Sequence, residues 1–139
     1  MIYVKLIHKK LIKAFEYLVV DFGYRIIEKS YFGRTIYVKF CSNNSEVAVY
    51  VEGNYVGLSV MPLIEIPGIE TERDKRFELY HILNVIHPNV NFKENEEQSL
   101  GKEIKRISYY FLKYCKEIIK GDFSIWPTLF KRWIIKDAK

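Results

Sequence analysis

The sequence has few of the residues that disulfide frameworks, metal centres and nucleotide-binding loops require. Its 139 residues include two cysteines, Cys41 and Cys115, and three histidines. Two cysteines cannot build a disulfide framework, and the histidines do not have the spacing of metal ligands. Neither a GxGxxG nor a Walker sequence occurs among the 7 glycines. We therefore predict no catalytic residue, no cofactor-binding residue and no metal site.

Long apolar runs are also missing. Lys5, Lys9, Lys10 and Lys13 interrupt the apolar residues at the N-terminus, so this segment does not resemble a signal peptide or a membrane span. We expect a cytoplasmic protein with reduced thiols and no membrane partner. The 49% hydrophobic and 28% charged residues are typical of a globular chain, and one domain over residues 1–139 is predicted.

The charges are unevenly distributed along the chain, although the net charge is only +5. Residues 1–40 contain 8 Lys and Arg against 3 Asp and Glu, residues 41–99 contain 4 against 10, and residues 100–139 contain 10 against 4. The basic ends could pack beside the acidic middle and cancel its field. Alternatively, the protein has a dipolar surface that steers a charged partner.

Hydrophobic periodicity predicts four helices. Apolar residues recur every three or four positions in residues 4–20 and 100–121, which predicts two amphipathic helices. A third helix is predicted over residues 71–86. A short last helix is expected after Ser124 as its N-cap, with Pro127 in its first turn.

Between these helices the hydrophobic period changes to two, which is typical of strands. Asn43-Asn44 and Gly53-Asn54 have the composition of two-residue hairpin loops. Loops at these positions align three apolar cross-strand rows: Ile36–Val51–Val56, Val38–Val49–Leu58 and Phe40–Val47–Val60. A shift of one residue would destroy this agreement, so the register is predicted as well as the strands.

The sequence therefore predicts an α+β fold. It consists of an N-terminal helix, a four-stranded antiparallel meander and three C-terminal helices packed on one sheet face. The first strand, near residues 24–30, is expected at the edge of the sheet. The first helix and the long helix should cover the apolar face, and the other face is left for solvent or a partner.

On this second face the register places Tyr37 beside Tyr50, with Lys39 and Tyr55 nearby. Tyrosine with a cation on an open sheet is typical of single-stranded nucleic-acid platforms, and tyrosine is also favoured at protein interfaces. A structural interpretation competes with both, because Tyr50 lies opposite Gly57 and an aromatic ring often covers a strand glycine.

The acidic middle of the chain is a second candidate surface. Glu72, Asp74 and Glu78 could meet a basic partner. The competing interpretation is that these carboxylates are simply solvated near the start of a helix.

The stretch from Tyr114 to Pro127 reads YCKEIIKGDFSIWP. It resembles the ending of a set of small uncharacterised bacterial proteins, in which a long helix with a tyrosine precedes Gly-Asp-Phe-Ser and a proline-containing helix. The layout is similar to that of some immunity proteins of bacterial toxin systems, which neutralise a toxin by binding it. The resemblance implies a non-enzymatic protein-binding domain that acts by surface occlusion.

Two hypotheses of different class follow. The first is this immunity-type inhibitor, with another protein as partner. The alternative is a nucleic-acid-binding module that uses Tyr37, Tyr50 and Lys39 on the sheet together with the basic helices. A ligand pocket between sheet and helices, and a homodimer through the sheet face, stay open at this point.

Overall fold

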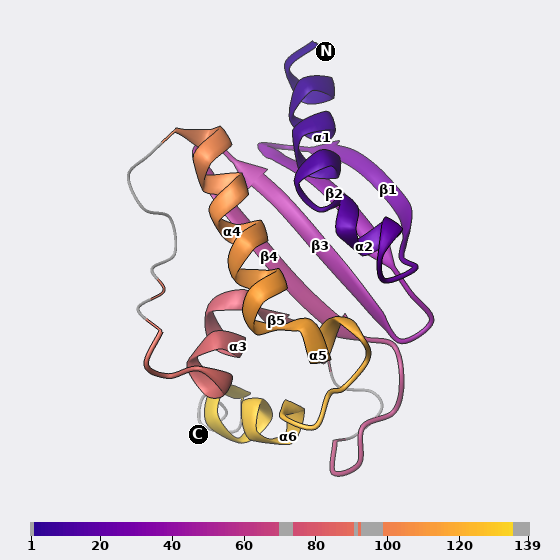
Figure 1. Cartoon of the computed structure of the whole chain (residues 1–139), viewed down its shortest axis with the longest axis vertical. Helices are drawn as coiled ribbons and strands as arrows, with labels where there is room; N and C mark the ends of the chain where they lie inside the picture. The colour runs from indigo at the N-terminus through magenta and orange to yellow at the C-terminus, as the bar shows by residue number, and fades with distance from the viewer. Residues whose placement is uncertain (1, 70–73, 91, 93–98, 135–139) are drawn as a thin grey trace.

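The helices lie on one side of an antiparallel sheet in the computed structural model (Figure 1), which describes residues 2–69, 74–90, 92 and 99–134. The elements, in chain order, are α1 (Ile2–Ala14), α2 (Glu16–Val20), β1 (Arg25–Phe32), β2 (Thr35–Cys41), β3 (Ser45–Glu52), β4 (Tyr55–Pro62), β5 (Phe77–Glu78), α3 (Leu79–Ile86), α4 (Leu100–Tyr114), α5 (Lys116–Ile119), α6 (Trp126–Leu129) and the π-helix η1 (Phe130–Ile134). The α+β fold is the predicted one.

The sheet has the strand order β1-β2-β3-β4-β5, with each neighbouring pair antiparallel. The predicted register of β2, β3 and β4 is confirmed: Val38 faces Val49, and Val49 faces Leu58. Gly53 has a φ of 63°, which the two-residue hairpin loop requires. The first strand is at the edge, as predicted, and a bulge near Ile26 shifts its register.

A fifth strand occupies part of the segment that the sequence analysis predicted as the start of a helix. Phe77 and Glu78 pair with Val60 and Ser59 of β4, and α3 begins only at Leu79. Pairing satisfies the backbone of β5 and buries Phe77, whose ring centroid lies 6.1 Å from that of Trp126. The helix prediction was therefore wrong before Leu79, and its first residues, 71–73, lie outside the described ranges.

Two helices predicted as continuous are each broken at a buried residue. The breaks fall at Phe15, with φ −111° and ψ 20°, and at Cys115, with φ −115° and ψ 20°. The first break is held by α4, because the Ser108 hydroxyl donates to the Ala14 carbonyl at 2.6 Å.

The short last helix begins at Trp126 and has Pro127 in its first turn, as predicted. The predicted N-cap is wrong. Ile125 occupies the N-cap position without a side-chain hydrogen bond, and the N–H of Ser124 instead donates to Asp122 at 3.0 Å.

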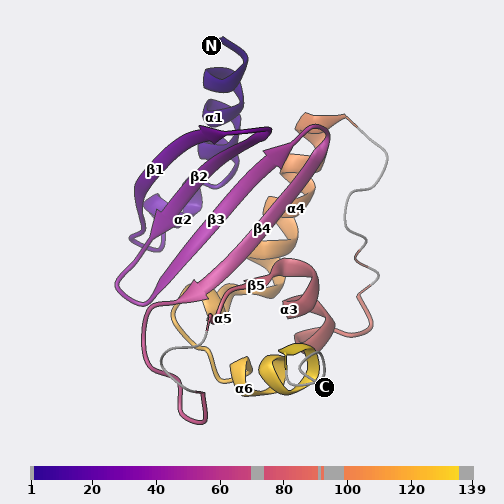
Figure 2. The ribbon, with the colours of Figure 1, turned by 180° about the vertical axis from the view of Figure 1, so that it is seen from behind.

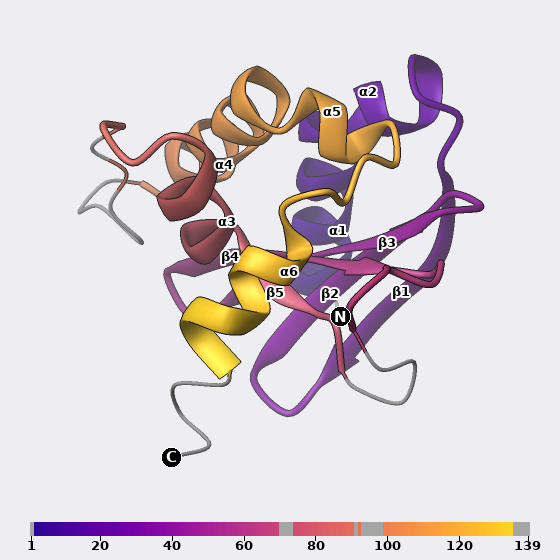
Figure 3. The same ribbon diagram turned by 90° about the horizontal axis from the view of Figure 1, so that it is seen from below.

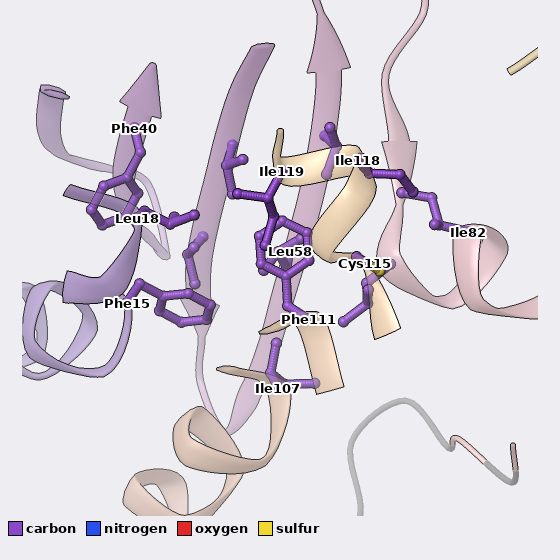
Figure 4. Packing of buried hydrophobic residues seen from close by; sticks show 14 of the residues in the cluster. Phe15, Leu18, Phe40, Leu58, Ile82, Ile107, Phe111, Cys115, Ile118 and Ile119 are labelled. Atoms are coloured by element: carbon purple, nitrogen blue, oxygen red, sulfur yellow. The ribbon is translucent and has the colours of Figure 1, made fainter. Parts of the chain in front are cut away.

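The core lies between the apolar sheet face and the helices, which Figure 3 shows together on one side of the sheet. Figure 4 shows Phe111 of α4 beside Leu58 of β4, with Ile107 and Cys115 around it. Phe111 and Trp126 are completely buried. In the part of the chain that the structure describes, no helix has the length and apolar character needed to cross a membrane.

Candidate functional site

The sheet face opposite the helices is open in Figure 2, where β1 to β4 are seen with no described helix in front of them. Three half-buried tyrosines cross this face in a line: Tyr37 on β2, Tyr50 on β3 and Tyr55 on β4. Their ring centroids lie 6.0 Å apart for Tyr37 and Tyr50 and 6.1 Å apart for Tyr50 and Tyr55. We call these three residues the tyrosine ladder.

The middle ring of the ladder rests on the backbone of β4. A Cβ atom built on Gly57 would lie 2.2 Å from Cζ of Tyr50. The predicted aromatic cover of this strand glycine is thus confirmed. Glycine at this position lets the ring lie flat on the sheet, which fixes the position of its hydroxyl.

The hydroxyl of Tyr50 donates to the carboxylate of Glu78 at 3.0 and 3.1 Å. Burial raises the pKa of Tyr50, and the negative charge of Glu78 raises it further. The phenol therefore stays protonated at neutral pH and remains a donor to Glu78. At the centre of the ladder, Tyr50 therefore packs over Gly57 and hydrogen-bonds to Glu78.

Two cations of this face, Lys39 and Arg76, are paired with carboxylates. Lys39 lies 3.7 Å from Glu28, which also accepts a 2.7 Å hydrogen bond from Ser30. The bond from Ser30 and the charge of Lys39 lower the pKa of Glu28. Lys39 therefore faces a carboxylate that is ionised at neutral pH.

Arg76, just before β5, makes the second ion pair. Its guanidinium contacts Glu46 and donates to the Ser59 hydroxyl at 2.8 Å. With Glu52 opposite Tyr55 and Arg25 opposite Cys41, the face carries four carboxylates, Glu28, Glu46, Glu52 and Glu78, against three cations, Arg25, Lys39 and Arg76. The open face therefore has a small excess of negative charge.

The structure places two of the three acidic residues predicted from the sequence as a partner surface. Glu78 contacts the tyrosine ladder. Asp74 is exposed in the loop before β5, where it accepts the N–H of Arg76 at 3.0 Å. Glu72 lies outside the described residues. The sequence did not indicate Arg76 as a site residue, because it predicted a helix over residues 71–86. The structure instead forms β5 at Phe77–Glu78, and this strand brings Arg76 to the sheet.

Cys115, His8 and His81 are all in contact with other parts of the fold. Burial raises the pKa of the Cys115 thiol to about 12, so it is not a nucleophile at neutral pH. His8 lies 3.0 Å from the carbonyl oxygen of Ser30, and His81 lies against Trp133 with a centroid distance of 4.4 Å. Within the described ranges, no three potential metal-ligating side chains come together.

Comparison of the chain with protein-family models, curated proteins and solved structures finds no match. The function is therefore argued from the geometry. The open face offers aromatic contact area, donors and acceptors already held in place, and an excess of negative charge. This combination suits recognition of a surface.

Proposed function

We propose that the protein is a non-enzymatic protein-binding domain and that the tyrosine ladder is the centre of its binding surface. The observation that carries this proposal is the line of three tyrosine rings across an uncovered sheet face. Tyrosine supplies a large contact area at a low cost in side-chain entropy, which makes it frequent at protein interfaces. The ladder is also held in place before any partner arrives.

The charge of the face supports a protein partner over a nucleic acid here. Lys39 and Arg76, the cations beside the ladder, already contact Glu28 and Glu46. Phosphates would meet unfavourable carboxylates on this face, whereas lysine and arginine side chains of a partner would find acceptors. The expected partner therefore presents a basic surface around an apolar centre.

The similarity of the layout to that of some immunity proteins of bacterial toxin systems supports a more specific form of the proposal. In this form the partner is a toxin, and the protein inhibits it by covering its surface. A rigid face suits such an inhibitor, because little side-chain ordering is lost when the complex forms.

The test compares two double variants of the full chain. Tyr37→Ala with Tyr55→Ala removes the outer rings of the ladder. Tyr3→Ala with Leu6→Ala is the control, since these side chains are 55% and 48% exposed on α1, on the other side of the sheet. Each tagged protein is used to capture partners from lysate of its source cells, and the affinity for the purified partner is measured by calorimetry.

We expect the wild type and the control variant each to capture one partner in a stoichiometric complex. Loss of interface hot spots should weaken binding by about 2 kcal/mol or more per ring, or roughly 30-fold. Equal binding by the ladder variant and the control, or the absence of any stoichiometric partner, would overturn the proposal.

Cell growth tests the toxin-inhibitor form of the proposal. Expression of the captured partner alone should arrest growth, and co-expression of the wild type or the control variant should restore it. The ladder variant should fail to restore growth. A captured partner that is harmless to cells would refute the toxin-inhibitor form.

A further inference from the structure

Helices α1 and α4, on the other side of the sheet, are rich in lysine. Helix α1 contains Lys5, Lys9, Lys10 and Lys13 and no acidic residue. Helix α4 lies beside α1 (Figure 1), and its one acidic residue, Glu103, is buried against Arg106. Helices α1 and α4 are therefore basic, whereas the opposite sheet face has a small excess of carboxylates.

A groove of about 630 Å³ runs between α1 and α4. It is lined by Lys10 and Lys13 of α1, Lys102 and Lys105 of α4 and the single carboxylate of Glu16, with Ala14 and Ile104 among the apolar residues. We call the four lysines and the space between them the basic groove. All four lysines are exposed, and no ion pair among the described residues includes them.

The geometry of the groove concentrates positive charge. The ammonium of Lys10 reaches the first turn of α4, where it would lie 4.0 Å from a Cβ built on Gly101. The N-terminus of α4, where the Ser99 hydroxyl accepts the N–H of Lys102, adds the partial positive charge of the helix dipole. Cations gathered in this way repel one another, and an anion in the groove relieves the repulsion.

The positive charge continues along the exposed side of α4. Lys102, Lys105, Tyr109 and Lys113 are spaced three or four residues apart and all exposed, so they form one stripe of about 16 Å. Lys113 donates to the hydroxyl of Tyr109 at 2.9 Å, and its ammonium lies 5.3 Å from the centroid of that ring. An exposed ring thus stands between cations along a line.

We propose that the basic groove and this stripe bind the phosphate backbone of single-stranded nucleic acid. A linear series of lysines matches a linear polyanion, and the ammonium group is a suitable point charge for phosphate. Tyr109 offers a ring on which an unpaired base can stack. These features favour nucleic acid over an acidic protein.

This inference moves the nucleic-acid hypothesis from the sheet to the helices, and it does not depend on the proposed protein-binding face. The experiment measures binding of a fluorescent single-stranded RNA of about 20 nucleotides by anisotropy, from roughly 50 to 200 mM salt. The double variant Lys10→Gln/Lys105→Gln is compared with a control double variant, Lys29→Gln/Lys131→Gln. Both pairs remove two exposed lysines and lower the net charge from +5 to +3.

The wild type should bind with a steep salt dependence. Loss of two phosphate contacts should reduce the slope of log K against log salt by about 1.4 and weaken binding about 25-fold near 0.1 M salt. The control pair should bind like the wild type. Tyr109→Ala should weaken binding while leaving the salt slope unchanged, since stacking releases no counterions.

Three results would overturn the inference. The first is no binding of the RNA by the wild type at low salt. The second is an equal loss of affinity in both lysine pairs, which would show diffuse attraction to net charge. The third is displacement of the RNA by polyglutamate of equal total charge as efficiently as by unlabelled RNA, which would assign the groove to acidic proteins.

Discussion

Replacement of Gly57 by alanine tests whether the ring of Tyr50 rests on the backbone of β4. An alanine Cβ would lie 2.2 Å from Cζ and 2.4 Å from the hydroxyl oxygen of Tyr50, so the ring must move away. That movement separates the phenol from Glu78, which accepts its hydrogen bond. The tyrosine ladder would lose its centre.

Two opposing contributions determine the change in the free energy of unfolding caused by Gly57→Ala. Overpacking of this kind costs about 1–3 kcal/mol. The loss of glycine's freedom in the unfolded chain returns about 0.4–1 kcal/mol. We expect Gly57→Ala to destabilise the wild type by about 1–2 kcal/mol. In a Tyr50→Ala background the obstacle is absent, and the same substitution should stabilise the fold by about 0.4–1 kcal/mol.

The assay is urea denaturation of the four proteins of this double-mutant cycle, with the free energy of unfolding taken from curves of equal slope. A coupling of about 1–3 kcal/mol between the two positions is expected. If Gly57→Ala changes stability equally in both backgrounds, to within about 0.5 kcal/mol, the ring does not rest on the strand and the reasoning is refuted.

The other predictions concern the core and the thiols. Phe111→Ala should lower the free energy of unfolding by about 3–5 kcal/mol in urea, because the ring is completely buried; a loss below about 1 kcal/mol would contradict this packing. A thiol reagent should modify half-buried Cys41 in the folded protein and Cys115 only in denaturant, and equal rates would contradict the burial. Burial raises the pKa of Cys115 from 9.0 to about 12, so above about pH 9 the unfolded thiol ionises first and stability should fall by up to about 1.4 kcal/mol per pH unit. Cys115→Ala should remove this slope between about pH 9 and 10, and an unchanged slope would show that another group causes it.

The tyrosine ladder could be placed from the sequence because local and periodic signals agree there. Two hairpin loops set the register of β2, β3 and β4, and that register puts Tyr37 beside Tyr50 and Tyr50 opposite Gly57. Side chains alternate along a strand, so the apolar rows on one face also determine which residues share the other. The poor apolar alternation of residues 25–28 predicted that the first strand lies at the edge of the sheet, which the structure confirms.

The rest of the site depended on contacts between distant parts of the chain. Arg76 and Glu78 reach the open face because β5 pairs with β4 and buries Phe77, although the local pattern predicted a helix. The basic groove likewise depends on how α1 packs beside α4. Charge counts showed that the ends were basic, but they did not show that α1 and α4 meet on the side opposite the tyrosine ladder.

The sequence by itself thus determined the fold class, the register of the central strands and the composition of the sheet face. These follow from hydrophobic periodicity and turn chemistry, which act over a few residues. The tertiary structure decided where the helices break, which strand completes the sheet and how the charges divide between two faces. Those features depend on burial and pairing between distant segments, and local preference yields to such contacts when they satisfy the backbone and fill the core.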